Sequence, residues 1–303
     1  MASRRQHVVP CFYLKDFFPG YVYRKSEKSP RYTKKVRNIC VRKDYYGKSR
    51  DEILLPLDEI NSVIEAEAAP AIQKMLFDLR TVNQVDWIKL SYFFANMQIR
   101  NPYYIESLQD TFRKFTDQLN EMAEKIKESY EKAKAEGEEF AMPTEPNVYD
   151  SERYSLEEIN KSMEELETKD GHIRIAEDLY YHLKDIASYV QKMSLHIMEA
   201  TGATFFITTD TPLVLFSLTT GTPLGAGWAN SDAMAMIPIS PRYSFMLAYR
   251  GKPSIYTKTL TTYDVNLWNV NLMRYASQEV YSKYAYDLAQ DWMLRRGLWD
   301  KKQ

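Results

Sequence analysis

Apolar residues at helical spacing mark the chain from residue 57 onward. One series runs in steps of four residues: Ile60, Ile64, Ala68 and Ile72. In the next segment, Val82 to Arg100, apolar side chains share one face, and Gln98 continues that face. Apolar positions three and four residues apart predict amphipathic helices, so we expect helices over residues 57–100. A glutamine on an apolar face is expected to be buried and hydrogen-bonded.

Two longer series of apolar positions alternate three- and four-residue steps. The first is Ile105, Leu108, Phe112, Phe115, Leu119, Met122 and Ile126, and the second is Leu179, Leu183, Ile186, Val190, Met193 and Ile197. This spacing is typical of helices that pack along a coiled-coil seam. It predicts a heptad-patterned antiparallel helical arm over residues 103–200. The arm pairs either within one chain, as a hairpin, or between two copies.

Beyond Gly202 the pattern changes to short apolar runs separated by turn residues, which predict strands. We expect a small antiparallel sheet over residues 204–250, joined by short strands from the N-terminal region. The whole chain then forms an α+β protein with a mostly helical body, as one domain over residues 1–303. Its parts are a basic strand-and-turn region at 1–50, helices at 57–100, the helical arm at 103–200, the sheet at 204–250 and C-terminal helices at 264–303.

Composition narrows the class of protein. The chain has 303 residues, of which 45% are hydrophobic and 27% are charged, as in ordinary globular proteins. Two cysteines, Cys11 and Cys40, cannot form a disulfide framework and lack the spacing of a thiolate metal site. No apolar run approaches the roughly 18–20 residues that cross a bilayer, and the N-terminus does not resemble a signal peptide. We therefore expect a cytoplasmic protein with no membrane partner.

The net charge of −1 conceals an uneven distribution. Residues 1–50 contain 14 Lys and Arg against three acids, whereas residues 101–170 contain 19 acids against nine Lys and Arg. Tyrosines are interleaved with the basic residues of the first region. Cations neutralise phosphates and aromatic rings stack on bases, so this mixture favours a single-stranded nucleic acid as partner. The substrate-binding candidates are Arg24, Lys25, Lys34 and Lys35. Alternatively, the basic and acidic regions attract each other within the fold.

Familiar catalytic motifs do not occur in the chain. It has no glycine-rich phosphate loop, His-Glu-x-x-His, nucleophile elbow or Cys-x-x-Cys. With ten glycines in 303 residues, a nucleotide cradle built from backbone amides is disfavoured. Hydrolysis of a small nucleotide is therefore a third-ranked expectation.

The N-terminal run Gln6-His7-Val8-Val9-Pro10-Cys11-Phe12-Tyr13-Leu14 sets a histidine beside a proline and aromatic residues. It resembles the opening of the bacterial family known as domain of unknown function 4238, whose hallmark is an N-terminal His-Tyr-x-Pro. Three further stretches resemble marks of that family: Gln98-Ile99-Arg100-Asn101-Pro102, Phe206-Ile207-Thr208-Thr209-Asp210-Thr211-Pro212 and Ile237-Pro238-Ile239-Ser240-Pro241. Asn271 resembles an asparagine that follows the family's sheet. The marks cover residues 6 to about 280.

The chain departs from the family pattern at three positions. Val8 replaces a tyrosine, and Thr209 and Thr211 replace a serine and an asparagine. The last change removes a side-chain amide and puts any role of that position in doubt. The resemblance implies an architecture and a set of residues, but it implies no reaction.

The polar residues of these marks support two interpretations. In the functional one, His7 is a general base or metal ligand, with Asp210 and Glu65 as carboxylate partners that could hold a divalent metal such as Mg²⁺. Arg100 then holds a phosphate or stabilises developing charge, Gln98 completes the catalytic set, and Gln6 and Asn271 bind substrate. In the structural one, Asp210 caps the turn at Pro212 and pairs with Arg100, while His7 and Gln98 satisfy buried backbone groups.

The expected function is a nucleic-acid-processing phosphodiesterase that resembles a ribonuclease or deoxyribonuclease, with defence against phage as a context suggested by the resemblance. The alternative is a non-catalytic module that binds nucleic acid or protein and forms homo-oligomers through residues 103–200. Cleavage of labelled RNA or DNA distinguishes them, because only the first interpretation predicts products.

Overall fold

The computed structural model describes residues 5–25, 27–43, 45, 55–78, 81–136, 160–161, 164–166, 171–221 and 227–300. The chain divides into two compact units. The first comprises residues 1–105 and 176–303, and the second comprises residues 106–175. The first unit combines helices with small sheets, which confirms the α+β prediction.

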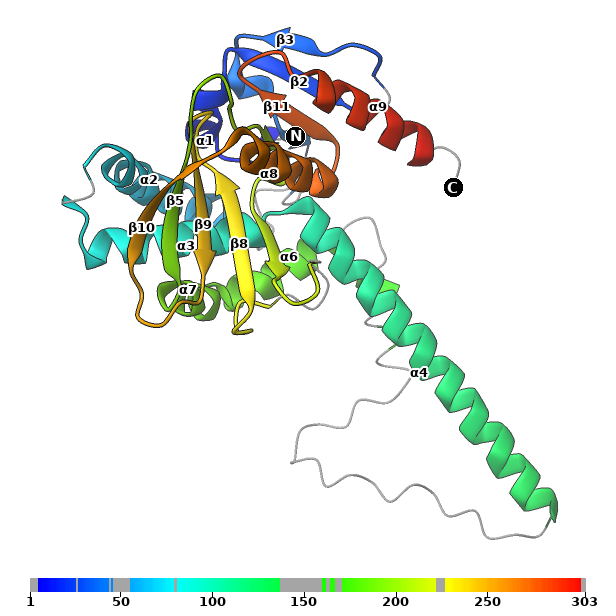
Figure 1. Cartoon of the computed structure of the whole chain (residues 1–303). Helices are drawn as coiled ribbons and strands as arrows, with labels where there is room; N and C mark the ends of the chain where they lie inside the picture. Colours follow the sequence, from blue (N-terminus) through cyan, green and yellow to red (C-terminus); the bar gives the residue numbers. More distant parts are fainter. Residues whose placement is uncertain are drawn as a thin grey trace. The chain divides into compact units, whose positions relative to one another are not determined.

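Helices α2 (Leu55–Phe77), α3 (Gln84–Ile99) and α7 (Leu183–Gln191) form one layer of the first unit (Figure 1). Helix α3 begins at a capping box, in which the Asn83 side chain accepts from the Asp86 amide and the Asp86 carboxylate accepts from the Asn83 amide. Such reciprocal bonds satisfy amides that the first helical turn leaves without partners. The helix pair predicted over residues 57–100 is confirmed.

A five-stranded sheet lies against this helical layer, with strands in the order β10-β5-β9-β8-β7. The strands are β5 (Ser194–Ala200), β7 (Val214–Ser217), β8 (Ala233–Pro238), β9 (Tyr243–Ala248) and β10 (Ile255–Leu260). Neighbouring strands are antiparallel except β10 and β5, which are parallel. The sheet is therefore mixed rather than purely antiparallel.

Alternation along the strands gives the sheet two apolar faces. On one face Phe245 of β9 meets Phe94 of α3, with ring centroids 6.2 Å apart. On the other face Met198 and Met246 pack with Val265 of α8 (Thr262–Tyr275). Because both faces are covered, the central strands are buried on both sides.

A second sheet has four strands in the order β3-β2-β11-β6, all antiparallel. They are β2 (Gly20–Arg24), β3 (Arg31–Thr33), β6 (Thr208–Thr209) and β11 (Glu279–Ser282). The N-terminal strands thus join β6, as predicted, but they do not join the larger sheet. A separate pair is formed by β1 (Arg5–His7) and β4 (Val41–Lys43).

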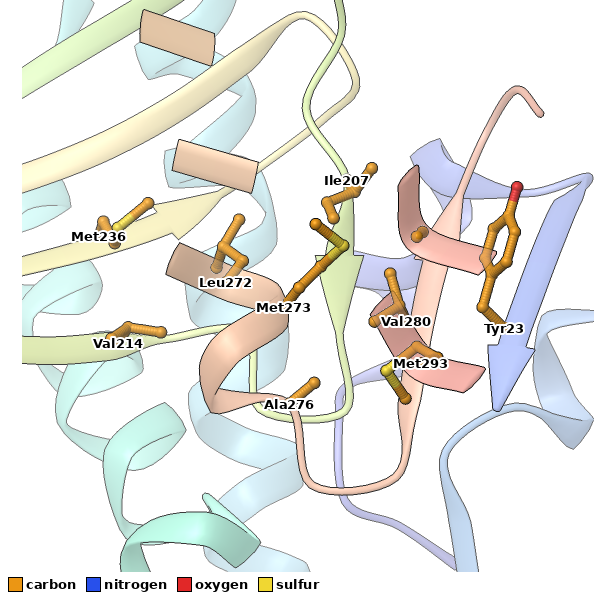
Figure 2. Close-up of a cluster of buried hydrophobic side chains, with 10 residues drawn as sticks. Tyr23, Ile207, Val214, Met236, Leu272, Met273, Ala276, Val280 and Met293 are labelled. Atoms are coloured by element: carbon orange, nitrogen blue, oxygen red, sulfur yellow. The ribbon is translucent and has the colours of Figure 1, made fainter. Parts of the chain in front are cut away.

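Helix α8 links the cores of the two larger sheets. Figure 2 shows Leu272 and Met273 of α8 between Val214 and Met236 of the five-stranded sheet and Val280 of β11. Met293 of α9 (Asp287–Asp300) joins the same cluster. This continuous apolar core holds the second sheet in a fixed place relative to the helix that precedes β11.

The second heptad series does not form one long helix. Helix α6 (Gly171–Tyr181) ends before His182, and α7 ends at Gln191. The expected positions Met193 and Ile197 lie before and within β5, so the helical prediction is wrong from residue 194 to residue 200. Strand β5 is buried at nearly every position, and two neighbouring strands satisfy its backbone, so tertiary pairing overrides the local apolar spacing.

The C-terminal prediction also requires correction. C-terminal helices were expected over residues 264–303, but α8 ends at Tyr275 and strand β11 follows it. The β11 backbone pairs with β2 and β6, which lie far away in the sequence. Local spacing of apolar residues does not indicate pairing with such distant strands.

In the second unit, α4 (Pro102–Glu136) continues from the first unit over its whole predicted heptad series. Gln109 donates to the Leu166 carbonyl (3.0 Å), and Asn160 donates to Asn120 Oδ1 (3.0 Å). The described residues 160–161 and 164–166 therefore run along α4 in the opposite direction. Residues 137–159, in the middle of the predicted helical arm, lie outside the described residues. Among the described helices, none combines the length and apolar character needed to cross a membrane.

Candidate functional site

His7 lies at the end of β1, where its backbone is fixed from two sides. It pairs with Val41 of β4, and the next residue, Val8, donates its amide to the Cys40 carbonyl (3.0 Å). Pro10 then starts the short helix α1 (Cys11–Leu14). Strand β1 and Pro10 fix the backbone on either side of the junction, where the half-buried His7 side chain is attached.

Arg100 joins His7 to Glu65. Arg100 follows the last turn of α3 and is 3% exposed. Its Nη1 donates to Glu65 Oε1 (2.5 Å), and its Nη2 donates to the carbonyl oxygen of His7. A buried guanidinium requires such partners, because an unpaired charge in the interior is strongly destabilising. The structure therefore brings together three of the predicted site residues, on β1, α2 and α3.

Cys11 completes this cluster, and sequence reasoning assigned it no role. Its Sγ is 3.3 Å from Nε2 of the His7 ring. Burial raises the pKa of the Cys11 thiol, and the nearby Glu65 carboxylate raises it further. The thiol is therefore protonated at neutral pH and acts as a hydrogen-bonding neighbour of the ring. The signal available in the sequence was the four-residue spacing of Cys11 and His7 at the start of α1.

The two glutamines of the predicted site are buried. Gln98 is 4% exposed and Gln6 is 6% exposed. In the described part of the chain, no group donates a hydrogen bond to the Gln98 side-chain oxygen. The prediction that Gln98 is buried is confirmed, whereas its expected hydrogen bond at this oxygen is not observed there.

Asp210 belongs to a different network. It is 4% exposed, and its carboxylate accepts from the amides of Ser277 (2.9 Å) and Gln278 (2.7 Å). These bonds fix the chain where it leaves α8 for β11. Burial raises the pKa of Asp210 to about 6, although the two amides and the Arg42 charge act in the opposite direction. Asp210 thus caps a turn, but the turn is at 277–278 rather than at Pro212.

The surroundings of Asp210 are rich in ionisable groups. Arg24 Nε donates to Glu279 Oε1 (2.5 Å), and Tyr281 donates to Glu279 Oε2 (2.7 Å). Burial, followed by the charge of Asp210, raises the pKa of the Cys40 thiol. Because Cys40 accepts from Val8 and precedes β4, the β1–β4 ladder connects this network to the His7 cluster.

The asparagine that supports the sheet is Asn269, which sequence reasoning missed. Asn269 is 1% exposed, accepts from the Ile207 amide (3.1 Å) and donates to the Phe205 carbonyl (2.9 Å). Asn271 lies on the same helix and is half-buried. At the altered positions, Thr209 Oγ1 accepts from the Thr211 amide (3.0 Å), and Thr211 Oγ1 donates to the Tyr275 carbonyl (2.6 Å). The hydroxyls of Thr209 and Thr211 therefore make hydrogen bonds that fix the end of β6.

The β2–β3 hairpin carries exposed basic residues. Tyr32 on β3 is 51% exposed and meets Tyr21 of β2 edge to face, with ring centroids 5.2 Å apart. Exposed cations lie near this ring in the sequence: Lys28, Arg31, Lys34, Lys35 and Arg37. Lys25 is half-buried, and Arg24 is engaged by Glu279.

The predicted metal ligands Glu65 and Asp210 have different partners. Within the residues that the structure describes, no three His, Cys, Asp or Glu side chains form a group that could hold a metal ion. Glu65 is held by a guanidinium and Asp210 by backbone amides.

Fold and site together define an α+β protein in which an N-terminal histidine is anchored to a buried arginine that pairs with a half-buried glutamate. The chain belongs to the family described as protein of unknown function (DUF4238), whose model matches residues 5–285. A search of curated proteins and a search of solved structures each found no match.

Proposed function

We propose that the protein is a phosphodiesterase that cleaves single-stranded RNA, with His7 as the residue that transfers protons. The observation that carries the proposal is the anchoring of His7. Arg100 holds its carbonyl oxygen while the imidazole remains half-buried beside Cys11. A positioned imidazole is suited to general acid–base catalysis, for which histidine is the side chain most often used.

RNA fits this arrangement because it supplies its own nucleophile. The His7 imidazole takes the proton of a ribose 2′-hydroxyl, and the resulting oxygen attacks the adjacent phosphorus. A 2′,3′-cyclic phosphate forms, the bond to the 5′-oxygen breaks, and the imidazolium returns the proton to that leaving oxygen. The step requires no oxidant or reductant, and it does not occur in DNA, which lacks the hydroxyl.

Arg100 acts in this proposal as a positioning residue. Both of its bonded nitrogens are engaged inside the protein, and the side chain is 3% exposed. Phosphate binding is assigned instead to the exposed cations of the β2–β3 hairpin, with Lys34 and Lys35 among them, and base stacking to Tyr32. Asp210 supports the fold through its bonds to Ser277 and Gln278.

The test is cleavage of labelled single-stranded RNA, single-stranded DNA and duplex DNA, each with Mg²⁺, Mn²⁺ or chelator. We expect RNA products that end in a cyclic phosphate, and a loss of about 10²–10⁴-fold in His7→Ala. His182→Ala is the matched control, since His182 is an exposed histidine paired with Asp185 on α7. Equal rates for His7→Ala and the unaltered protein, or no cleavage of any substrate, would overturn the proposal.

A non-catalytic nucleic-acid-binding module is the second candidate, favoured by the exposed cations and Tyr32 of the hairpin. Binding of intact RNA with a steep salt dependence, without cleavage, supports this candidate. Lys34→Glu combined with Lys35→Glu then reduces both the affinity and the salt slope.

We also propose that the exposed heptad positions of α4 mediate pairing, within the chain or between two copies. Phe115, Met122 and Ile126 of α4 are exposed in the single chain. A dimer mass in light scattering that reverts to a monomer in Leu119→Glu supports pairing between copies, and an unchanged monomer excludes it.

The free thiols of Cys11 and Cys40 favour a reducing compartment such as the cytoplasm, where a defence role would be exercised.

A further inference from the structure

A solvent-open pocket of about 500 Å³ has a lining that includes none of the residues of the His7 cluster. Its lining comes from the end of β5, the loop that follows it, the turn between β8 and β9, and the segment after β11. The lining residues are Ala200, Gly202, Ala203, Thr204, Phe205, Pro241, Arg242 and Tyr284.

Backbone hydrogen bonds hold the walls of this pocket. The Ala200 amide donates to the Arg242 carbonyl, and the Phe206 amide donates to the Pro241 carbonyl, both at 2.8 Å. Gly202 has φ of +66°, a left-handed conformation that a residue with a side chain rarely adopts. The bonds tie the loop to the β8–β9 turn, so the pocket is already formed without a ligand.

Aromatic rings form one wall. Tyr284 is 55% exposed, and its ring meets Phe205 edge to face at 5.1 Å. Tyr286 meets Phe205 in the same manner at 5.6 Å. Phe205 is thus fixed by two tyrosines, while Tyr284 retains exposed ring surface. An exposed ring beside a preformed hollow is suited to stacking on a flat, unsaturated ligand.

Arg242 provides the polar part of the lining. Its Nε and Nη2 both donate to Glu199 Oε1, at 3.0 and 2.7 Å, and its guanidinium lies over the Tyr243 ring. The carboxylate fixes the guanidinium and compensates its charge. The pocket therefore offers oriented hydrogen-bond donors without a large excess of positive charge, which favours a neutral ring with carbonyl or ring-nitrogen acceptors over a free phosphate.

We propose that this pocket binds a nucleobase, stacked on Tyr284 and hydrogen-bonded to Arg242. A base combines a flat aromatic surface with acceptors on its edge, which are the two features that the lining recognises. The base can belong to a free mononucleotide or to a nucleotide within an RNA strand. This inference does not rest on the chemistry of His7, because a base pocket serves a binding module equally well.

The test has two binding arms, both with the full-length protein. In one, calorimetry measures binding of the four nucleoside 5′-monophosphates, with ribose 5-phosphate as the probe that lacks a base. In the other, fluorescence anisotropy measures binding of labelled ten-residue single-stranded RNA. We expect Tyr284→Ala to weaken binding about tenfold, since stacking on one aromatic side chain contributes roughly 1–3 kcal/mol per base. Tyr284→Phe retains the ring and should bind like the unaltered protein.

The controls separate this pocket from other sites. Tyr181→Ala removes a tyrosine on α6 that is 83% exposed and lies outside the pocket, and it should leave both arms unchanged. His7→Ala should also bind normally, so loss of cleavage and loss of base binding are distinguishable. Weakening by Tyr284→Ala in the RNA arm alone supports the proposal and assigns the base to a strand. Unchanged binding of Tyr284→Ala in both arms overturns it, and so does measurable binding of ribose 5-phosphate that is as tight as that of the mononucleotides.

Discussion

Glu65 is half-buried and Asp210 is buried, and their hydrogen-bond partners differ in kind. Glu65 pairs with the guanidinium of Arg100, which also holds the His7 carbonyl. Asp210 accepts from the backbone amides of Ser277 and Gln278. A carboxylate held by a side chain helps to position other side chains, whereas one held by amides fixes the path of the chain. The Arg100–Glu65 network positions His7, whereas the Asp210 network stabilises the fold.

Breaking the Arg100 network should have the largest effect on stability. Arg100→Met leaves the partly exposed Glu65 carboxylate without its cation and leaves the His7 carbonyl without this donor. We expect the free energy of unfolding to fall by about 3 kcal/mol, at the lower end of the range for removing one partner of a buried ion pair, because Glu65 keeps some contact with solvent. Chemical denaturation of the variant measures this change.

The exposed pair of Arg113 and Asp110 on α4 provides the control. Exposed ion pairs contribute roughly 0–1 kcal/mol, so Arg113→Met should have little effect. The double variant Arg100→Met with Glu65→Met should be more stable than Arg100→Met alone, because it also removes the uncompensated carboxylate. An Arg100→Met protein as stable as the unaltered one would show that the pair does not hold the site.

The Asp210 network should respond to pH. The pKa of Asp210 is raised from 3.8 to about 6 in the folded protein, so the folded state binds this proton more tightly than the unfolded state. The resulting stabilisation is fully present below pH 3.8 and is lost as the pH rises through about 6. The expected loss is about 2–3 kcal/mol, since one pKa unit corresponds to roughly 1.4 kcal/mol.

Urea denaturation at several pH values between 4 and 7 measures this slope, with Asp210→Asn as the reference. The variant cannot titrate at this position, so the difference between the two proteins isolates Asp210 from the other carboxyl groups. A difference that does not vary with pH would mean that the two amides outweigh burial and hold the pKa at its ordinary value.

The sequence predicts helices well in this protein because their periodicity is local. Helices α2, α3 and α4 follow the apolar spacing directly. Strand β5 was missed because its buried residues continue a heptad spacing, and β11 was missed because its partners β2 and β6 lie far away in the sequence. Pairing between distant segments determines both strands.

For the site, the sequence predicts some of the residues but not their contacts. Arg100 could be named from the resemblance of residues 98–102 to a mark of the family, but only the fold shows that it holds the carbonyl oxygen of His7. The role of Asn269 depends on the backbone of Phe205 and Ile207, which lie 64 and 62 positions away. A residue whose partners are backbone groups of a distant strand gives no local signal.

Two asparagines on α8 allow a matched test of this point. Asn269→Ala leaves the Ile207 amide and the Phe205 carbonyl without their partner in the core. We expect a loss of about 2 kcal/mol in unfolding free energy, because orphaned buried groups retain their desolvation cost. Asn271→Ala, at a half-buried position on the same helix, should change stability by roughly 0.5 kcal/mol or less. Equal losses in the two variants would contradict the assignment of Asn269 as the supporting asparagine.

The smallest expected effect on stability belongs to His7. Its carbonyl oxygen, rather than its ring, makes the bond to Arg100, and every residue has a carbonyl oxygen. The ring contributes its contact with Cys11 and its half-buried surface. His7→Ala should therefore change the unfolding free energy by about 1 kcal/mol or less, while cleavage of RNA falls by the far larger factor expected for a proton-transfer residue. Chemical denaturation gives the change in unfolding free energy, and an RNA cleavage assay on the same preparation gives the change in rate. A variant that loses several kcal/mol would instead assign the His7 ring to the structural network, together with Asp210. A stable variant without activity would support His7 as the residue that transfers protons.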